Sequence, residues 1–171
     1  MMCSSPCQVA DGHDQLYPES PSVFELKGIR ALLKLNPLVP ELIVSDLSRS
    51  LAFYCGVLGF RIEYERPEEH FAFLSFGGSQ LMLEQDWQSE SPWRVGPLEA
   101  PYGRGINLSI ECADANAMVA ALADAGHAIR NPLEERWYRK GSMLVGQRNF
   151  LVQDPDGYLL RFAEDIGMKS A

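Results

Sequence analysis

The chain has 171 residues and a mass of 19.1 kDa, enough for one ordinary domain or for two small modules with a shared core. Its 46% apolar and 22% charged residues exclude a wholly disordered, collagen-like or coiled-coil chain. A formal charge of −8 has the wrong sign for a protein that neutralises phosphates, so we expect no nucleic acid partner.

Cysteine content and the N-terminal sequence predict a cytoplasmic protein. The four cysteines are too few and too widely spaced for a disulfide framework or a structural zinc site, which indicates reduced thiols. The chain does not open with a basic start and an apolar stretch, and no apolar run approaches the roughly 18 residues that span a membrane. We therefore expect a cytoplasmic location and no membrane partner.

The N-terminal part of the chain is expected to lie outside the main domain. Residues 1–21 are rich in Ser, Pro, Cys and Asp and lack periodicity, which is typical of a disordered tail. Residues 22–37 form a predicted helical extension, which opens with Ser22 and Glu25 at the spacing of a capping box. Prolines then mark the entry to the main domain.

Residues 38–86 form a predicted βαβββ module. The run LVPELIVSD is a short strand, LSRSLAFYCGVLGF is a helix, and RIEYE, FAFLSF and QLMLEQ are strands separated by turn residues. Asp46 is the expected N-cap of the helix, and Gly59 suits the left-handed position that follows a helix.

The second half of the chain repeats this order after an irregular link at residues 87–104. In the predicted second module, residues 105–166, the strand GINLSIECAD precedes the helix ANAMVAALADAG and the strands HAIRNP, RNFLVQ and YLLRFAE. Asp114 and Gly126 mirror the helix cap and the terminal glycine of the first module, which favours an internal duplication. Residues 167–171 are expected to form a C-terminal tail.

Two segments of this pattern resemble the vicinal-oxygen-chelate superfamily, which includes glyoxalase I, extradiol dioxygenases and bleomycin-resistance proteins. They are IVSDLSRSLAFYCGVLGF in the first module and LVQDPDGYLLRFAE at the end of the second. The resemblance implies an α+β fold in which two paired βαβββ modules form a cup-shaped mixed sheet with flanking helices. It also implies that the cup is the active or binding site and that the chain forms a homodimer.

Metal-dependent members of this superfamily hold a divalent ion with His, Gln or Glu at four strand positions. The matching positions of this sequence hold Val39, Glu84, Gly105 and Arg161. Only Glu84 offers an oxygen ligand, and the guanidinium of Arg161 would repel a cation. We therefore expect neither a metal ion nor another cofactor, and we assign no catalytic residue.

Side-chain alternation along the predicted strands indicates which residues face the cup. The expected lining combines carboxylates, an amide and a guanidinium with aromatic side chains, which is the makeup of a binding cleft. The candidate ligand-binding residues are Glu41, Phe71, Phe73, Glu84, Asn107, Trp137, Tyr138 and Arg161. A carboxylate could pair with Arg161 to balance a buried charge, contact a ligand, or do both.

The resemblance, the missing metal ligands and the acidic composition together predict a metal-free small-molecule binding protein of the bleomycin-resistance type. Such a protein would sequester a basic glycopeptide antibiotic in clefts between two subunits, without breaking a bond. Two alternatives stay open, because one fold hosts many functions. They are a glyoxalase-like lyase or dioxygenase of the same superfamily, and a binder of another small metabolite.

Overall fold

A computed structural model describes residues 33–86 and 93–171. The predicted tail at residues 1–21 and most of the predicted helical extension lie outside the described residues. The described end of that extension, residues 33–37, is irregular rather than helical. No helix in the described part of the chain combines the length and the apolar character needed to cross a membrane.

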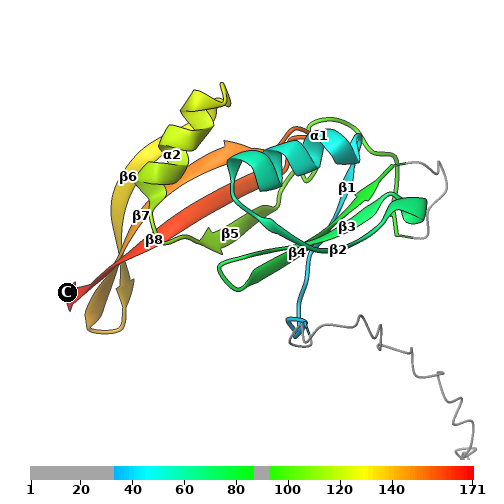
Figure 1. The fold of residues 1–171 in the computed structure, drawn as a ribbon. Coiled ribbons are helices and arrows are strands. Elements are labelled where there is room, and N and C mark those ends of the chain that lie inside the picture. Colours follow the sequence, from blue (N-terminus) through cyan, green and yellow to red (C-terminus); the bar gives the residue numbers. More distant parts are fainter. Residues whose placement is uncertain (1–32, 87–92) are drawn as a thin grey trace, which may run out of the picture. The chain divides into compact units, whose positions relative to one another are not determined.

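The first module contains a four-stranded mixed sheet and a helical segment (Figure 1). Its elements are β1 (Glu41–Val44), α1 (Leu47–Leu51), the π-helical turn η1 (Ala52–Val57), β2 (Arg61–Arg66), the 3₁₀ turn η2 (Pro67–Glu69), β3 (Phe71–Phe76) and β4 (Ser79–Gln85). The strand order is β1-β4-β3-β2, with β1 parallel to β4 and the other neighbours antiparallel.

The second module repeats this arrangement. Its elements are β5 (Asn107–Glu111), α2 (Ala115–Asp124), β6 (Ile129–Lys140), β7 (Met143–Gln153) and β8 (Leu159–Ser170). The strand order is β5-β8-β7-β6, and again the first strand pairs in parallel with the last (Figure 1). The predicted α+β fold built from two βαβββ modules is therefore confirmed, although the two sheets do not close into one.

Local sequence signals start and end the helices as predicted. The side chain of Asp46 accepts a hydrogen bond from the backbone N–H of Arg49 at 2.9 Å, and Asp114 does the same for Ala117 at 2.9 Å. After the helices, Gly59 and Gly126 have positive φ angles of 80° and 73°. The predicted first helix departs from α geometry at Ala52, where the π-helical turn begins.

One hydrophobic core joins the two modules. Alternate strand residues and the inner faces of the helices contribute to it. Its largest fully buried members include Phe53, Tyr54, Leu74, Leu83, Leu122, Phe150, Leu160 and Phe162. Leu42 and Val44 lie in this core, so strand alternation directs their neighbours Glu41 and Ile43 to the opposite face of the first sheet.

The last three strands are longer than the sequence predicts. The segment WYRK ends β6, and MLVGQ opens β7, so the two strands form a long hairpin that turns at Gly141. A Cβ atom at Gly146 would lie 2.7 Å from both Ile166 Cγ1 and the ring of Trp137. A residue without a side chain at position 146 therefore lets the Trp137 ring lie over the sheet.

Candidate functional site

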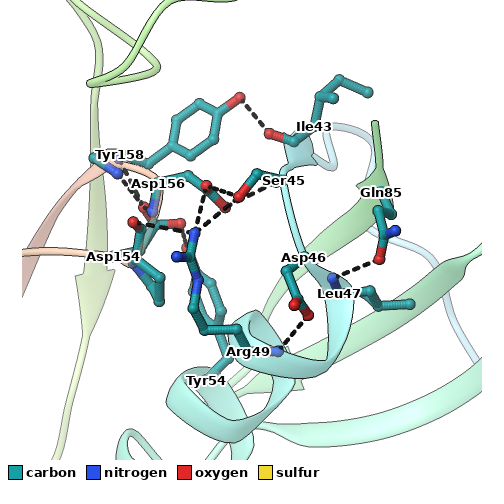
Figure 2. Close-up of polar contacts among 12 residues, drawn as sticks. Ile43, Ser45, Asp46, Leu47, Arg49, Tyr54, Gln85, Asp154, Asp156 and Tyr158 are labelled. Atoms are coloured by element: carbon teal, nitrogen blue, oxygen red, sulfur yellow. Dashed lines mark hydrogen bonds and ion pairs between the residues drawn. The ribbon is translucent and has the colours of Figure 1, made fainter. Parts of the chain in front are cut away.

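The turn between β7 and β8 is held against the first module by Asp156, which is almost fully buried. The Asp156 carboxylate accepts hydrogen bonds from the backbone N–H and the hydroxyl of Ser45, which follows β1. It also forms an ion pair with Arg49 of α1, at an N···O distance of 2.9 Å (Figure 2). This contact joins the two sequence segments that carry the family resemblance.

Asp154 organises the same turn from inside (Figure 2). Its Oδ1 atom accepts hydrogen bonds from the backbone N–H groups of Asp156, Gly157 and Tyr158, and its Oδ2 atom accepts one from the hydroxyl of Tyr54 at 3.0 Å. Burial raises the pKa of Asp154, although these hydrogen bonds lower it. Burial and the nearby charge of Asp154 also raise the pKa of Tyr54 well above its usual value.

Tyr158 adds a third link between the modules. Its hydroxyl donates a hydrogen bond to the backbone carbonyl oxygen of Ile43 in β1, at 3.1 Å (Figure 2). Burial raises the pKa of Tyr158 to about 12, so the hydroxyl keeps the proton that it donates. The segments that identify the fold therefore serve to attach one module to the other.

The second face of the first sheet brings together two of the predicted site residues. Glu41 in β1 and Glu84 in β4 lie on adjacent strands, with their carboxyls close enough to interact. Partial desolvation of the Glu41 carboxyl raises its pKa, and the neighbouring Glu84 raises it further, whereas the charge of Arg66 lowers it. This carboxyl pair is able to share a proton or to bind a cation.

Aromatic side chains lie on the same face as the carboxyl pair, but the exposed ring is not one of the two that the sequence predicted. Phe71 and Phe73 in β3 are only 2% and 1% exposed. Tyr64 of β2 stacks on Phe73 with a ring separation of 5.1 Å, and the Arg66 guanidinium lies 3.8 Å from the centre of the Phe71 ring. Tyr64 is 39% exposed, so it presents the aromatic surface on this face.

Sequence reasoning missed Tyr64 and Arg66. The signal was available in the segment RIEYER, because an antiparallel hairpin with FAFLSF places Tyr64 opposite Phe73 and Arg66 opposite Phe71. A β-bulge after Ile62 shifts this register, so alternation counted from the first residue of the strand assigns the faces wrongly.

The second sheet holds the remaining predicted site residues, which lie in different places. Tyr138 and Arg161 line one cavity of about 390 Å³, and Asn107 lines another of about 290 Å³ together with Gln80. Trp137 does not line either cavity. Its ring instead packs over Gly146, and the ammonium group of Lys169 lies 3.8 Å from the ring centre.

The pairing of Arg161 with a carboxylate, which the sequence left open, is not found within residues 33–86 and 93–171. The Nε atom of Arg161 is buried there and has no hydrogen-bond partner. Glu41 instead interacts with Glu84 and Arg66, which belong to the first sheet. The ligand-binding role of all eight candidates stays a prediction.

The donor chemistry does not fit a divalent metal ion at the positions that the family resemblance implies. Val39 and Gly105 offer no side-chain donor, and Arg161 is a cation, so Glu84 is the single suitable ligand. Among the described residues, no group of three or more His, Cys, Asp or Glu side chains is arranged to hold an ion.

The thiols of the described residues are poorly suited to nucleophilic chemistry. Burial raises the pKa of Cys55, with a smaller contribution from the charge of Glu65. Burial also raises the pKa of Cys112 to about 11. Both thiols therefore stay protonated near neutral pH, where a nucleophile needs the thiolate form.

The chain is similar to known proteins over most of its length. Residues 34–162 match a family model described as the Glyoxalase/Bleomycin resistance protein/Dioxygenase superfamily. The chain is 27% identical over 138 residues to a bleomycin resistance protein of Geobacillus stearothermophilus, with coverage of 75% of this chain and 96% of the relative. It is 32% identical over 133 residues to a lactoylglutathione lyase of Haemophilus influenzae, with coverage of 74% and 90%.

A solved structure supports the fold. The crystal structure of a protein of unknown function from Agrobacterium tumefaciens superimposes with a TM-score of 0.58 and is 27% identical in sequence. The match covers 78% of this chain and 97% of that protein.

Proposed function

This chain belongs to the glyoxalase/bleomycin resistance protein/dioxygenase superfamily, and we propose that it is a binding protein that sequesters a cationic small molecule without altering it. The observation that carries the proposal is the carboxyl pair of Glu41 and Glu84 on the same face of the first sheet as the exposed ring of Tyr64. Carboxylates neutralise an organic cation, and an aromatic face attracts it through its quadrupole.

The proposed ligand is a basic glycopeptide antibiotic of the bleomycin class. The similarity to proteins named for bleomycin resistance supports this choice, as does the acidic composition of the chain. We also propose that two copies form a homodimer in the cytoplasm and complete each cleft between them. A second chain would add surface to sheets that are open in the single chain.

Calorimetric titration of the full chain with metal-free bleomycin tests this function. We expect saturable binding of about one drug per chain, and a dimeric mass by light scattering. Glu84→Gln should weaken binding by about tenfold, or about 1.4 kcal/mol, because it removes one of the two carboxylates. Glu65→Gln is the matched control, because this exposed carboxylate lies in β2 opposite Ala72, a residue of the core.

The pH dependence of binding should also differ between these variants. In the wild type, the carboxyl pair takes up a proton as the pH falls through the raised pKa of Glu41, so cation affinity is lost in that range. Desolvation of Glu41 stays in Glu84→Gln, but the variant removes the neighbouring carboxylate that raises this pKa further, so its remaining affinity should persist to lower pH. Lack of saturable binding by the wild type at millimolar drug, or equal affinity of the Glu84 and Glu65 variants, would refute the proposal.

An enzyme of the same superfamily is the second candidate. The similarity to lactoylglutathione lyases and the carboxylate of Glu84 favour it. After incubation with zinc or nickel and dialysis, a metal-binding enzyme would retain one ion per chain and lose it on Glu84→Gln. We expect no such retention, because the other three positions lack suitable donors.

A further inference from the structure

Three cationic residues line one cavity of the second sheet. The cavity has a volume of about 390 Å³ and is lined by Tyr138, Arg139, Lys140, Val145, Gln147 and Arg161, and we call it the β6–β8 cavity. None of its lining residues is acidic, although acidic residues outnumber Lys and Arg by 23 to 15 in the chain. The local charge of this cavity is thus opposite to that of the whole protein.

The two arginines of the β6–β8 cavity have no carboxylate partner in the part of the chain that the structure describes. Within residues 33–86 and 93–171, neither Arg139 nor Arg161 forms an ion pair with a carboxylate. Most other arginines of this part of the chain do, among them Arg136 with Glu134 on the same strand as Arg139. Desolvation of a guanidinium without a carboxylate partner costs free energy. An anion that binds here would offset this cost.

Arg161 carries the largest part of this argument. Its Nε atom is buried without a hydrogen-bond partner, so the guanidinium is held on the sheet and is less hydrated than a surface arginine. Its neighbours along the cavity wall, the hydroxyl of Tyr138 and the amide of Gln147, are neutral donors that an anion can also accept from. A cation with neutral donors beside it is the arrangement that recognises a carboxylate.

Carboxylates do lie nearby, in an adjoining cavity of about 260 Å³. That cavity shares Val145 and Gln147 with the β6–β8 cavity and is lined by Glu111 and Asp165. The Asp165 carboxylate is already engaged, because it accepts a hydrogen bond from the backbone N–H of Gly167 at 2.7 Å. The acidic and basic groups of this face are therefore separated into two neighbouring cavities.

We propose that the β6–β8 cavity binds an organic carboxylate of small size, with the charged group at Arg161 and an aromatic or apolar body against Tyr138 and Val145. The volume suits a ligand of a few hundred daltons at most. This site lies on the second sheet, whereas the proposed cation site lies on the first. It therefore stands whether or not the chain binds bleomycin, and it would suit the acidic end of a ligand that carries both charges.

Benzoate is the probe, and benzamide is its uncharged analogue of the same shape. Both are titrated into the full isotope-labelled chain, and amide chemical shifts are followed by NMR. We expect saturable shifts at millimolar benzoate that cluster on residues 138–147 and around Arg161, and benzamide should bind at least about tenfold more weakly. Comparable binding of the two probes, or shifts confined to the first sheet, would overturn the proposal.

Substitutions identify the group that binds the carboxylate. Arg161→Gln should weaken benzoate binding by about tenfold, and Arg161→Lys by less, because lysine keeps the charge and loses the planar donor geometry. Arg130→Gln is the matched control, since Arg130 lies in β6 outside the cavity and contacts an amide, Gln153. Unchanged benzoate affinity of the Arg161→Gln variant would contradict the assignment.

A second variant keeps the test valid if Arg161→Gln does not fold. The double change of Arg139→Gln and Lys140→Gln alters exposed residues near the end of the β6–β7 hairpin, so it should leave the fold intact. It removes two of the three cations, and we expect benzoate binding to weaken several-fold. The same affinity as the wild type in this folded variant would contradict the proposal.

Discussion

Asp154 is a buried carboxylate that satisfies three backbone N–H groups and the hydroxyl of Tyr54, and burial nevertheless raises its pKa above the ordinary value of 3.8. The folded protein therefore holds the Asp154 proton more tightly than the unfolded chain does. The stability that comes from this group is fully present below pH 3.8 and is lost as the pH rises through the raised pKa. At neutral pH the fold thus carries the cost of a desolvated charge.

Asp154→Asn should remove this dependence on pH. The amide oxygen can still accept from the three backbone N–H groups, so we expect a loss of unfolding free energy at neutral pH of about 1 kcal/mol or less. Asp154→Ala should cost at least about 3 kcal/mol, because several buried donors lose their acceptor. Urea unfolding at acid and neutral pH measures both variants, and a wild-type pH slope in Asp154→Asn would contradict the explanation.

The pKa of Glu41 depends on Glu84, its partner in the carboxyl pair, and on other residues of neighbouring strands. Partial burial of the Glu41 carboxyl raises its pKa, and the parallel pairing of β1 with β4 brings Glu84 close enough to raise it further. Arg66 moderates the effect from β2. The charge on this face therefore depends on residues from three strands, β1, β2 and β4.

At the scale of elements, the pairing of β6 with β7 determines which side chains lie on each face of the second sheet. The two strands pair from Ile129 to Lys140, and β7 pairs in turn with the full length of β8. Trp137 lies opposite Gly146 and Tyr138 lies opposite Val145, so the two adjacent aromatic residues face opposite sides. Tyr138 lines the β6–β8 cavity, whereas Trp137 does not.

Gly146→Val tests this packing. A Cβ atom at position 146 meets Ile166 and the Trp137 ring at 2.7 Å, so we expect the variant to lose about 1–3 kcal/mol of unfolding free energy through overpacking. Trp137 fluorescence should change with it, because the ring is displaced. Gly56→Ala is the control, because no atom lies within 4 Å of the added Cβ, and its stability should stay within about 0.5 kcal/mol.

At the scale of residues 33–171, the two modules behave as one unit because they share a core and a buried polar junction. Asp156 accepts hydrogen bonds from Ser45 and pairs with Arg49, and Tyr158 reaches the carbonyl oxygen of Ile43. The apolar core supplies the main driving force for association of the modules. The polar contacts determine which residues of the two modules meet.

Asp156→Ala should weaken the attachment of the modules. It leaves the N–H and hydroxyl of Ser45 without their acceptor, so we expect a loss of about 2–4 kcal/mol and less cooperative unfolding. Glu99→Ala is the control, because it removes an ion pair between exposed side chains, Glu99 and Arg104, and should cost less than about 1 kcal/mol. Equal losses in the two variants, measured by urea unfolding, would show that the junction contributes no more than a surface ion pair.

The sequence by itself determined the features that depend on neighbours along the chain. The N-caps Asp46 and Asp114 and the glycines at positions 59 and 126 bound the helices by local hydrogen bonding and backbone freedom, so their spacing was readable without a structure. The repeated pattern predicted the two βαβββ modules, and the family resemblance implied the α+β fold that they form. The caps and the helix-ending glycines act over only a few residues of sequence.

Only the tertiary structure decided which side chains meet, because strand register depends on pairing between distant segments and on bulges. The bulge in β2 lets Tyr64 cover Phe73, which the sequence had assigned to the cleft. The long pairing of β6 with β7 separates Trp137 from Tyr138. Pairing of β7 with both β6 and β8 brings Tyr138 and Arg161 to one cavity, and Arg161 forms no ion pair with a carboxylate of the described residues.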